Sequence, residues 1–179
     1  MGFTIQQPGS ITFVIECDPS WTPCEKQQVK QKADELNART PVSRDPAYSA
    51  AKRDQGDRCA AAWRRAFNSR RAGRNPAPSP LLGNDPNCHP NGGTESDFAH
   101  ACMKDEFKEL EPAAQDDYIK SCQPDHTMEL QFAGGAPQGP MALMSGRVNG
   151  SLGSQLSNSG YDSAGQPAPV DHFETMGCD

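Results

Sequence analysis

An alternation of apolar and polar residues near the start of the chain predicts one short strand. In SITFVIE, residues 10 to 16, Ile11, Phe13 and Ile15 share one face and polar or smaller residues separate them. This period of two is typical of a half-buried strand. The following segment, from about residue 25 to residue 39, is rich in good helix formers and a proline follows it closely, so it predicts a helix.

A longer period predicts a second helix from about residue 47 to residue 71. Ala60, Trp63 and Phe67 have the i, i+3, i+7 spacing of a buried helical stripe. The segment after it, residues 72 to 93, is rich in Pro, Gly and Asn and predicts a long loop. This loop separates the two halves of the sequence.

The second half of the chain begins with two predicted helices. One is expected over residues 94 to 110, with Thr94 or Ser96 as its N-cap, and a shorter one over residues 111 to 122. DHTMELQF, residues 125 to 132, is strand-like, and AGGAPQGP after it has the composition of a loop.

The end of the chain predicts one more helix. MALMSG is apolar and suits a strand or an extended arm, and RVNGSLGSQLSN carries Val148, Leu152 and Leu156 in a helical stripe. The polar residues 159 to 179 are expected to be irregular.

The composition limits the fold to a small core with long loops. The 179 residues include 16 Pro and 16 Gly, and 35% are hydrophobic. We expect an α+β fold, mainly helical, in one compact domain. Residues 1 to 93 form its basic, helical first part, and residues 94 to 179 its second. No apolar run approaches the roughly 18 to 20 residues that a membrane span needs, so we expect no membrane span.

Charge is distributed unevenly along the chain, although the net charge is only -6. Residues 26 to 74 carry 13 Lys or Arg and five acids, whereas residues 75 to 179 carry four bases and 15 acids. A segment this basic either neutralises phosphates or is the solvated surface of a helix. The arginines expected to flank its outer face are Arg58, Arg64, Arg65, Arg70 and Arg71. The last four of these are the predicted DNA contacts.

The chain has an odd number of cysteines: Cys17, Cys24, Cys59, Cys88, Cys102, Cys122 and Cys178. Six can pair as three disulfides and leave one thiol free. The easiest pair to predict is Cys17 with Cys24, because turn-rich DPSWTP separates them. Cys88, His89, His100 and Cys102 also suggest structural zinc, but their spacing matches no standard finger. Disulfide bonding or burial is the simpler interpretation.

The segment PDHTMELQFAGGAP, residues 124 to 137, carries the main candidate chemistry. An unperturbed imidazole has a pKa of about 6.5, which suits a base that activates water near neutral pH. A cation that balances charge on a phosphate prefers oxygen ligands. We therefore predict His126 as the general base and Asp125 and Asn149 as metal ligands. The order strand, loop, strand or arm, and helix is that of a ββα-metal motif, at about residues 122 to 158.

Neighbouring residues on a regular strand point to opposite faces. Asp125 and His126 therefore need a strand end or a bulge to serve one site. Pro124 has no N–H for a ladder hydrogen bond, so we predict that it marks such an end.

These residues resemble the nuclease toxin domains of bacterial polymorphic toxins, in the HNH and endonuclease VII (His-Me finger) superfamily. Those sequences commonly run Asp-His, Glu-Leu-Gln, Gly-Gly and, about 20 residues later, Asn-x-Ser-x-Gly-x-Gln. The matching positions here are Asp125, His126, Glu129, Leu130, Gln131, Gly134, Gly135, Asn149, Ser151, Gly153 and Gln155. The chain departs from many HNH enzymes in having no third histidine on the helix.

The resemblance implies a DNase secreted by a bacterium to act in the cytoplasm of a target cell. Such domains follow the targeting module of a type VI secretion or Rhs effector, and an immunity protein neutralises them. The expected cofactor is Mg²⁺, or another divalent cation such as Mn²⁺, Zn²⁺ or Ni²⁺.

Three further residues have predicted supporting roles. Glu129 either orients a ligand or is a solvated strand residue, Gln155 fixes the loop to the helix, and Arg147 steadies the phosphate.

Two other functions also fit the sequence. One is an RNase toxin on the same scaffold, and the other is a cysteine-stabilised binding or adaptor module without catalysis, in which His126 is an ordinary strand histidine. A cell-wall hydrolase has no paired carboxylates or zinc-protease motif to support it.

Overall fold

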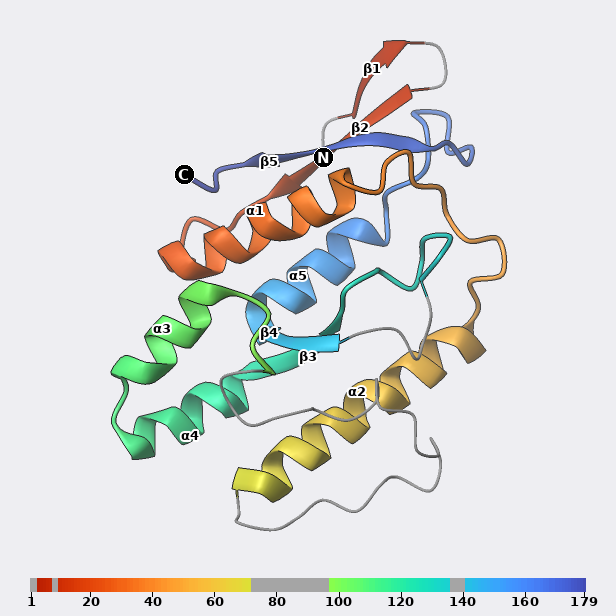
Figure 1. Cartoon of the computed structure of the whole chain (residues 1–179). Coiled ribbons are helices and arrows are strands. Elements are labelled where there is room, and N and C mark those ends of the chain that lie inside the picture. The colour runs from red at the N-terminus through yellow and green to blue at the C-terminus, as the bar shows by residue number, and fades with distance from the viewer. Residues whose placement is uncertain (1–2, 8–9, 72–96, 136–140) are drawn as a thin grey trace. The chain divides into compact units, whose positions relative to one another are not determined.

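The computed structural model describes residues 3 to 7, 10 to 71, 97 to 135 and 141 to 179 (Figure 1). The fold is of the α+β class, as predicted, with helices and two small sheets. It divides into two compact units. The sheet unit comprises residues 1 to 48, 131 to 134 and 147 to 179, and the helical unit comprises residues 49 to 130 and 135 to 146. The predicted boundary at residue 93 lies outside the described residues.

The sheet unit is built on three strands in the order β1-β2-β5. β1 (Phe3–Gln7) is antiparallel to β2 (Ser10–Glu16), and β5 (Val170–Met176) is parallel to β2. The predicted strand over residues 10 to 16 is confirmed, with Ile11, Phe13 and Ile15 all buried.

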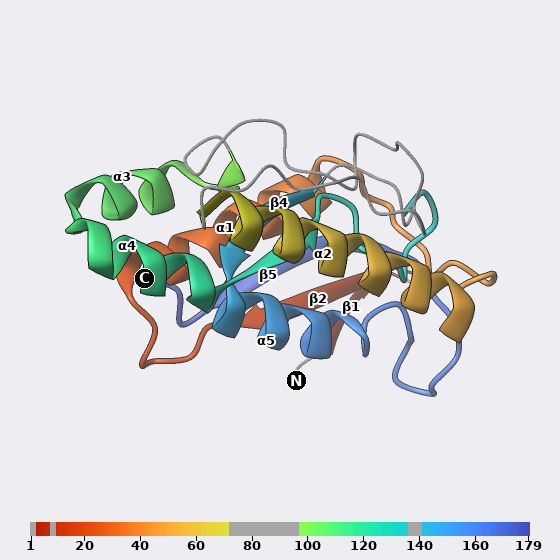
Figure 2. The ribbon, with the colours of Figure 1, turned by 90° about the horizontal axis from the view of Figure 1, so that it is seen from below.

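Two helices lie on the same side of this sheet (Figure 2). α1 (Pro23–Asn37) begins two residues before the predicted start because Thr22 caps it, and its Val29, Ala33 and Leu36 are buried. α5 (Gly146–Leu156) buries Val148, Leu152 and Leu156, so the predicted stripe is confirmed.

The prediction that residues 159 to 179 are irregular is wrong, because they contain β5. The signal for this strand is weak, since a register shift at its start interrupts the alternation. Its partner β2 lies more than 150 residues earlier in the sequence, and a local pattern cannot show such a pairing.

The predicted bond between Cys17 and Cys24 is wrong. Cys17 is bonded to Cys178, with Cα atoms 5.2 Å apart. The parallel pairing of β2 with β5 explains why Cys17 bonds to Cys178. The C-terminal ends of the two strands lie side by side, and each cysteine closely follows one of these ends. Cys24, Cys59 and Cys102 are also disulfide-bonded.

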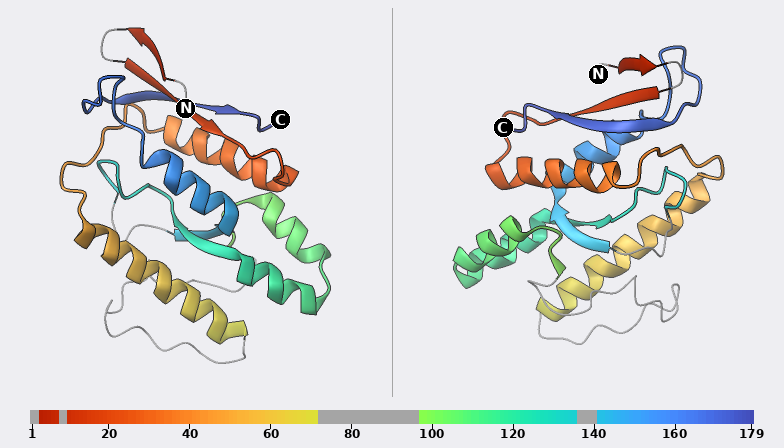
Figure 3. Two further views of the ribbon diagram at one scale, coloured as in Figure 1. Left: turned by 180° about the vertical axis from the view of Figure 1, so that it is seen from behind. Right: turned by 45° about the horizontal axis from the view of Figure 1, so that its top comes forward.

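The helical unit contains α2 (Ala50–Arg71), α3 (Ala101–Glu109), α4 (Pro112–Ser121) and the antiparallel pair β3 (Cys122–His126) and β4 (Met141–Ser145). α4 runs directly into β3 (Figure 3). The rings of Phe98, Phe107 and Tyr118 contact one another next to α3 and α4. α4 confirms the helix predicted over residues 111 to 122.

Two predictions for this unit need correction. The strand expected over residues 125 to 132 ends at His126, because the chain turns there. The helix expected from residue 94 begins only at Ala101, because Phe98 bridges to Leu143 of β4. The caps predicted for that helix at Thr94 and Ser96 lie outside the described residues.

The buried stripe of α2 is also displaced from the prediction. Gly56, Cys59 and Trp63 are buried, whereas Ala60 is partly exposed, and the side chain of Phe67 lies outside the described part. The true stripe has the same i, i+3, i+7 spacing but starts at a glycine, which carries no hydrophobic signal.

In the described part of the chain no helix is both long and apolar enough to cross a bilayer.

Candidate functional site

The last two residues of β3 are Asp125 and His126, the predicted ligand and base. They pair with Ala142 and Met141 of β4 in a ladder without a register shift. Of the two devices predicted to bring them to one site, the strand end is therefore present and the bulge is absent.

Pro124 does not mark the end of the strand, contrary to prediction. It is the third of five residues in β3 and pairs with Leu143. A proline is tolerated here because, in the part of the chain that the structure describes, β3 pairs with β4 in a two-stranded sheet, so the missing N–H can face away from the ladder.

The side chain of His126 faces α2. Cys122 and Pro124 are buried on one face of β3, and residues two apart share a face, which places His126 on the buried side. A Cβ atom built on Gly56 of α2 would lie 3.4 Å from Cε1 of His126 and 2.2 Å from Cδ1 of Leu130. The side chains of His126 and Leu130 therefore pack against the backbone of α2 at Gly56.

The two glycines after the strand let the chain fold back on itself. Gly134 has a φ of 92°, a conformation that other residues rarely adopt. A Cβ atom on Gly135 would lie 2.3 Å from the carbonyl oxygen of Glu129, so only glycine fits there. The half-buried Glu129 therefore sits in a tight turn rather than on the predicted strand.

Three other predicted site residues, Arg147, Asn149 and Gln155, lie on α5 in the sheet unit. Asn149 is the fourth residue of this helix and is partly exposed. The carboxamide of Gln155 accepts from the backbone N–H of Glu16 over 2.7 Å and donates to its carbonyl oxygen over 2.9 Å. It also donates to Oγ of Ser151. These contacts tie α5 to β2.

Arg147 is held by Glu25 in the same unit. Nε of Arg147 donates to the Glu25 carboxylate over 3.1 Å and Nη2 donates over 2.5 Å. Hydrogen bonding to that carboxylate, followed by its charge, raises the pKa of Arg147. The predicted phosphate contact would therefore compete with this pair.

The five arginines predicted to flank the outer face, of which the last four are the predicted DNA contacts, lie along α2. Arg58, Arg64 and Arg65 are exposed, while the side chains of Arg70 and Arg71 lie outside the described residues. Within the described part of the chain no three His, Cys, Asp or Glu side chains form a group that could hold a metal ion.

The zinc interpretation fails at Cys102, because a disulfide-bonded sulfur is not a thiolate ligand. His100 is buried at the position before α3, and Cys88 and His89 lie outside the described residues.

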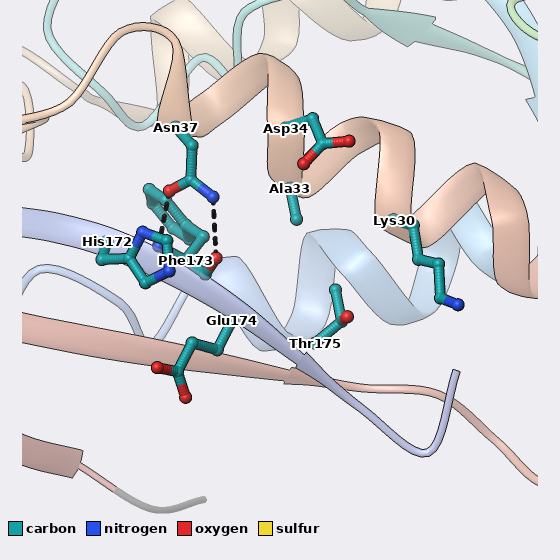
Figure 4. Close-up of a pocket in the computed structure, with 8 residues that line it drawn as sticks. All are labelled: Lys30, Ala33, Asp34, Asn37, His172, Phe173, Glu174 and Thr175. Carbon is teal, nitrogen blue, oxygen red and sulfur yellow. Dashed lines mark hydrogen bonds between the residues drawn. The ribbon is translucent and has the colours of Figure 1, made fainter. Parts of the chain in front are cut away.

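The structure also has an open pocket of about 430 Å³ that sequence reasoning missed, between α1 and β5 (Figure 4). His172 lines it, and with Asp171 it forms the second Asp-His pair of the sequence. The carboxamide of Asn37 exchanges two hydrogen bonds with the backbone of Phe173, at 2.7 and 2.8 Å. Asn37 thus covers part of the outer edge of β5, as a neighbouring strand would. β5 forms one wall of this pocket. Because β5 was not predicted, the sequence provided no indication of the pocket.

Among the described cysteines, Cys122 is the free one, and it is buried. Burial raises the pKa of its thiol to about 12. The group is therefore not a nucleophile near neutral pH.

Comparison of the chain with protein-family models, with curated proteins and with solved structures finds no match.

Proposed function

We propose that this protein is a metal-dependent endonuclease that hydrolyses DNA, with His126 as its general base. The observation that carries the proposal is the position of His126. It is the last residue of β3 in the consecutive order β3, β4, α5, and its ring rests on α2, a helix with exposed arginines. A half-buried imidazole next to a cationic helix suits the activation of water beside a phosphate.

In this proposal His126 takes a proton from a water molecule as the water oxygen attacks phosphorus. The bond from phosphorus to the 3′ oxygen then breaks, and that oxygen is protonated from solvent. The products carry 5′-phosphate and 3′-hydroxyl ends. A bound Mg²⁺ or similar cation would stabilise the charge that grows on the phosphate and the leaving oxygen.

The proposed ligand within the helical unit is the carboxylate of Asp125, and the amide oxygen of Asn149 stays a ligand predicted from the sequence alone. Both are oxygen donors, which Mg²⁺ prefers, and both residues are partly exposed, so water and phosphate can complete the coordination. Asn149 belongs to the sheet unit, so mutation must test its role.

The alternation of side chains on β3 is a constraint on this proposal. His126 shares a face of β3 with Cys122 and Pro124, so in this proposal the carboxylate of Asp125, on the opposite face, reaches the cation around the end of the strand. His126 is the last residue of the strand, and the tight turn through Glu129 and Gly135 follows it.

Cleavage of supercoiled plasmid tests the proposal. Separate reactions contain Mg²⁺ or EDTA. Each is run with the wild type, with His126→Ala and with the control His172→Ala, which changes the histidine of the other Asp-His pair. Nicking that needs the metal, is lost in His126→Ala and is kept in His172→Ala supports the proposal. Cleavage by His126→Ala at the wild-type rate refutes the assigned base. Degradation of total RNA with intact plasmid would indicate the RNase toxin instead.

One observation favours a second function, a binding or adaptor module without catalysis. Five of the described cysteines are disulfide-bonded, which is typical of small extracellular binding domains. This function predicts that neither nucleic acid is cut and that reduction abolishes binding to a protein partner.

The biological role that we propose is an antibacterial toxin. It would be delivered by a secretion apparatus into the cytoplasm of a competing cell and neutralised by an immunity protein. Expression of the wild-type chain in a bacterium without that protein should stop growth, and expression of His126→Ala should not. Equal growth arrest by both would show that toxicity has another cause.

A further inference from the structure

The contact of His126 with α2 defines which side of this helix borders the proposed site. Gly56 is the seventh residue of a 22-residue helix, where glycine is unfavourable compared with alanine. No side chain fits there, because a Cβ atom would lie 2.2 Å from Leu130 and 3.4 Å from His126. The angular position of Gly56 on α2 is therefore the angular position at which His126 is seated.

The flank next to this position carries two arginines. Successive residues of an α-helix are turned by about 100°, so Cys59 and Trp63, both buried, lie within about 60° of Gly56 on one side. On the other side Arg53 and Arg64 lie at about 60° and 80°, and both are exposed. Gly56 thus lies at the border between the buried face of α2 and an exposed, cationic flank.

The other two described arginines of the predicted set lie on the back of the helix. Arg58 and Arg65 are turned by about 200° and 180° from Gly56, and both are exposed. A polyanion bound to these two would therefore lie on the side of α2 that faces away from His126.

We infer that nucleic acid lies along the flank of α2 that carries Arg53 and Arg64, and that this pair, rather than Arg58 and Arg65, holds the phosphate backbone beside His126. The inference rests on the proposed function and names the substrate contacts of that site.

The geometry and charge of this flank suit a phosphate backbone. Arg53 and Arg64 are 11 residues apart, about 16 Å along the helix axis, and duplex DNA carries one charge per about 1.7 Å of its axis. Two arginines at this spacing can contact separate phosphates. The ion pair between Arg53 and Asp54 is long, at 3.9 Å, and both side chains are more than half exposed. Such a pair contributes little, so a phosphate can displace it.

Four single variants of the full chain test the inference: Arg53→Gln, Arg64→Gln, Arg58→Gln and Arg65→Gln. Each removes one positive charge from the same helix, so the change in net charge is matched. Binding to fluorescent duplex DNA is measured by anisotropy in EDTA over a series of salt concentrations, and plasmid cleavage is measured separately in Mg²⁺. Circular dichroism checks that each variant is folded.

The expected result is a difference between the two pairs. Arg53→Gln and Arg64→Gln should each reduce the steepness of the fall of log affinity with log salt concentration by about one, and each should slow cleavage. Arg58→Gln and Arg65→Gln should change neither the salt dependence nor the cleavage rate. Equal effects in all four, or larger effects in the second pair, would overturn the inference and leave the nuclease proposal intact. A wild-type protein that neither binds nor cuts nucleic acid would overturn both.

Discussion

The carboxylate of Glu25 joins the start of α1 to Arg147 of α5. It accepts from the guanidinium of Arg147 and, through one of its oxygens, from the backbone N–H of Thr22 over 2.9 Å. Thr22 in turn accepts from the N–H of Glu25, which completes a capping box. A single side chain therefore both begins one helix and anchors the other.

Replacing Glu25 by alanine should destabilise the protein more than an ordinary change on α1. Glu25→Ala removes the half of the capping box that accepts from the N–H of Thr22, while Thr22 still accepts from the backbone N–H of residue 25. Loss of this hydrogen bond should lower the free energy of unfolding by roughly 0.5 to 1.5 kcal/mol, and loss of the partner of Arg147 should lower it further. Glu25→Gln keeps an oxygen for the N–H of Thr22 and should be intermediate. Urea denaturation gives the free energy of unfolding of the wild type, Glu25→Ala and Glu25→Gln. Gln27→Ala, which changes an exposed residue on the same helix, is the control. Equal stability of Glu25→Ala and Gln27→Ala would contradict this role.

Removing the bond between Cys17 and Cys178 should have a large effect on stability. The bond closes a loop with a sequence separation of 161 residues, and for loops of this length chain entropy predicts a loss of about 4 to 5 kcal/mol. The double variant Cys17→Ser, Cys178→Ser is compared with the wild type by denaturation. A difference below about 1 kcal/mol would show that the bond adds little to a β2-β5 pairing that is already stable.

The thiol of Cys122 should resist alkylation in the folded protein. Its pKa is raised from 9.0 to about 12, chiefly by burial, so the thiolate is scarce at pH 8 and also shielded. Iodoacetamide labelling followed by peptide mapping should modify Cys122 only after denaturation. Rapid labelling under native conditions would show that the site opens.

The same shift in pKa has a consequence at high pH. The unfolded thiol loses its proton near pH 9, whereas the folded one keeps it until about pH 12. The unfolded state therefore gains free energy from ionisation as the pH rises above about 9, and stability should fall across this window. Cys122→Ala should show a weaker fall in the unfolding free energy between pH 9 and pH 11.

Two glycine substitutions should have opposite effects on stability. A Cβ atom on Gly153, in α5, meets nothing within 4 Å, so Gly153→Ala should stabilise the helix by up to about 1 kcal/mol. Gly56→Ala should destabilise the protein because the new methyl group collides with Leu130. Adding Leu130→Ala to Gly56→Ala should remove this collision, which a double-mutant cycle detects as a coupling energy. Additive effects would refute the contact.

The sequence was most informative where a pattern is local. The strand over residues 10 to 16 and the stripe through Val148 and Leu156 follow from periodicity, the helix over residues 111 to 122 follows from its local sequence, and the structure confirms all three. β5 and the bond from Cys17 to Cys178 depend on a pairing between the two ends of the chain, which periodicity cannot reveal.

The candidate site shows the same division. That Asp125 and His126 lie at a strand end could be predicted, although the expected strand begins with them, after Pro124, whereas they are the last two residues of β3. That His126 rests on Gly56 could not, because glycine has no side chain and gives no signal of contact. The roles of Asp125, His126 and Asn149 stay predictions until cleavage is measured.

The bond from Cys17 to Cys178 has a mechanical consequence. If the chain is pulled from one end into a narrow pore, the segment between the two cysteines must enter as two strands side by side. Once the bond is reduced, and the other disulfides with it, the chain can enter as a single strand. Passage through a pore wide enough for only one extended strand would thus require a reductant on the entry side, whatever force is applied.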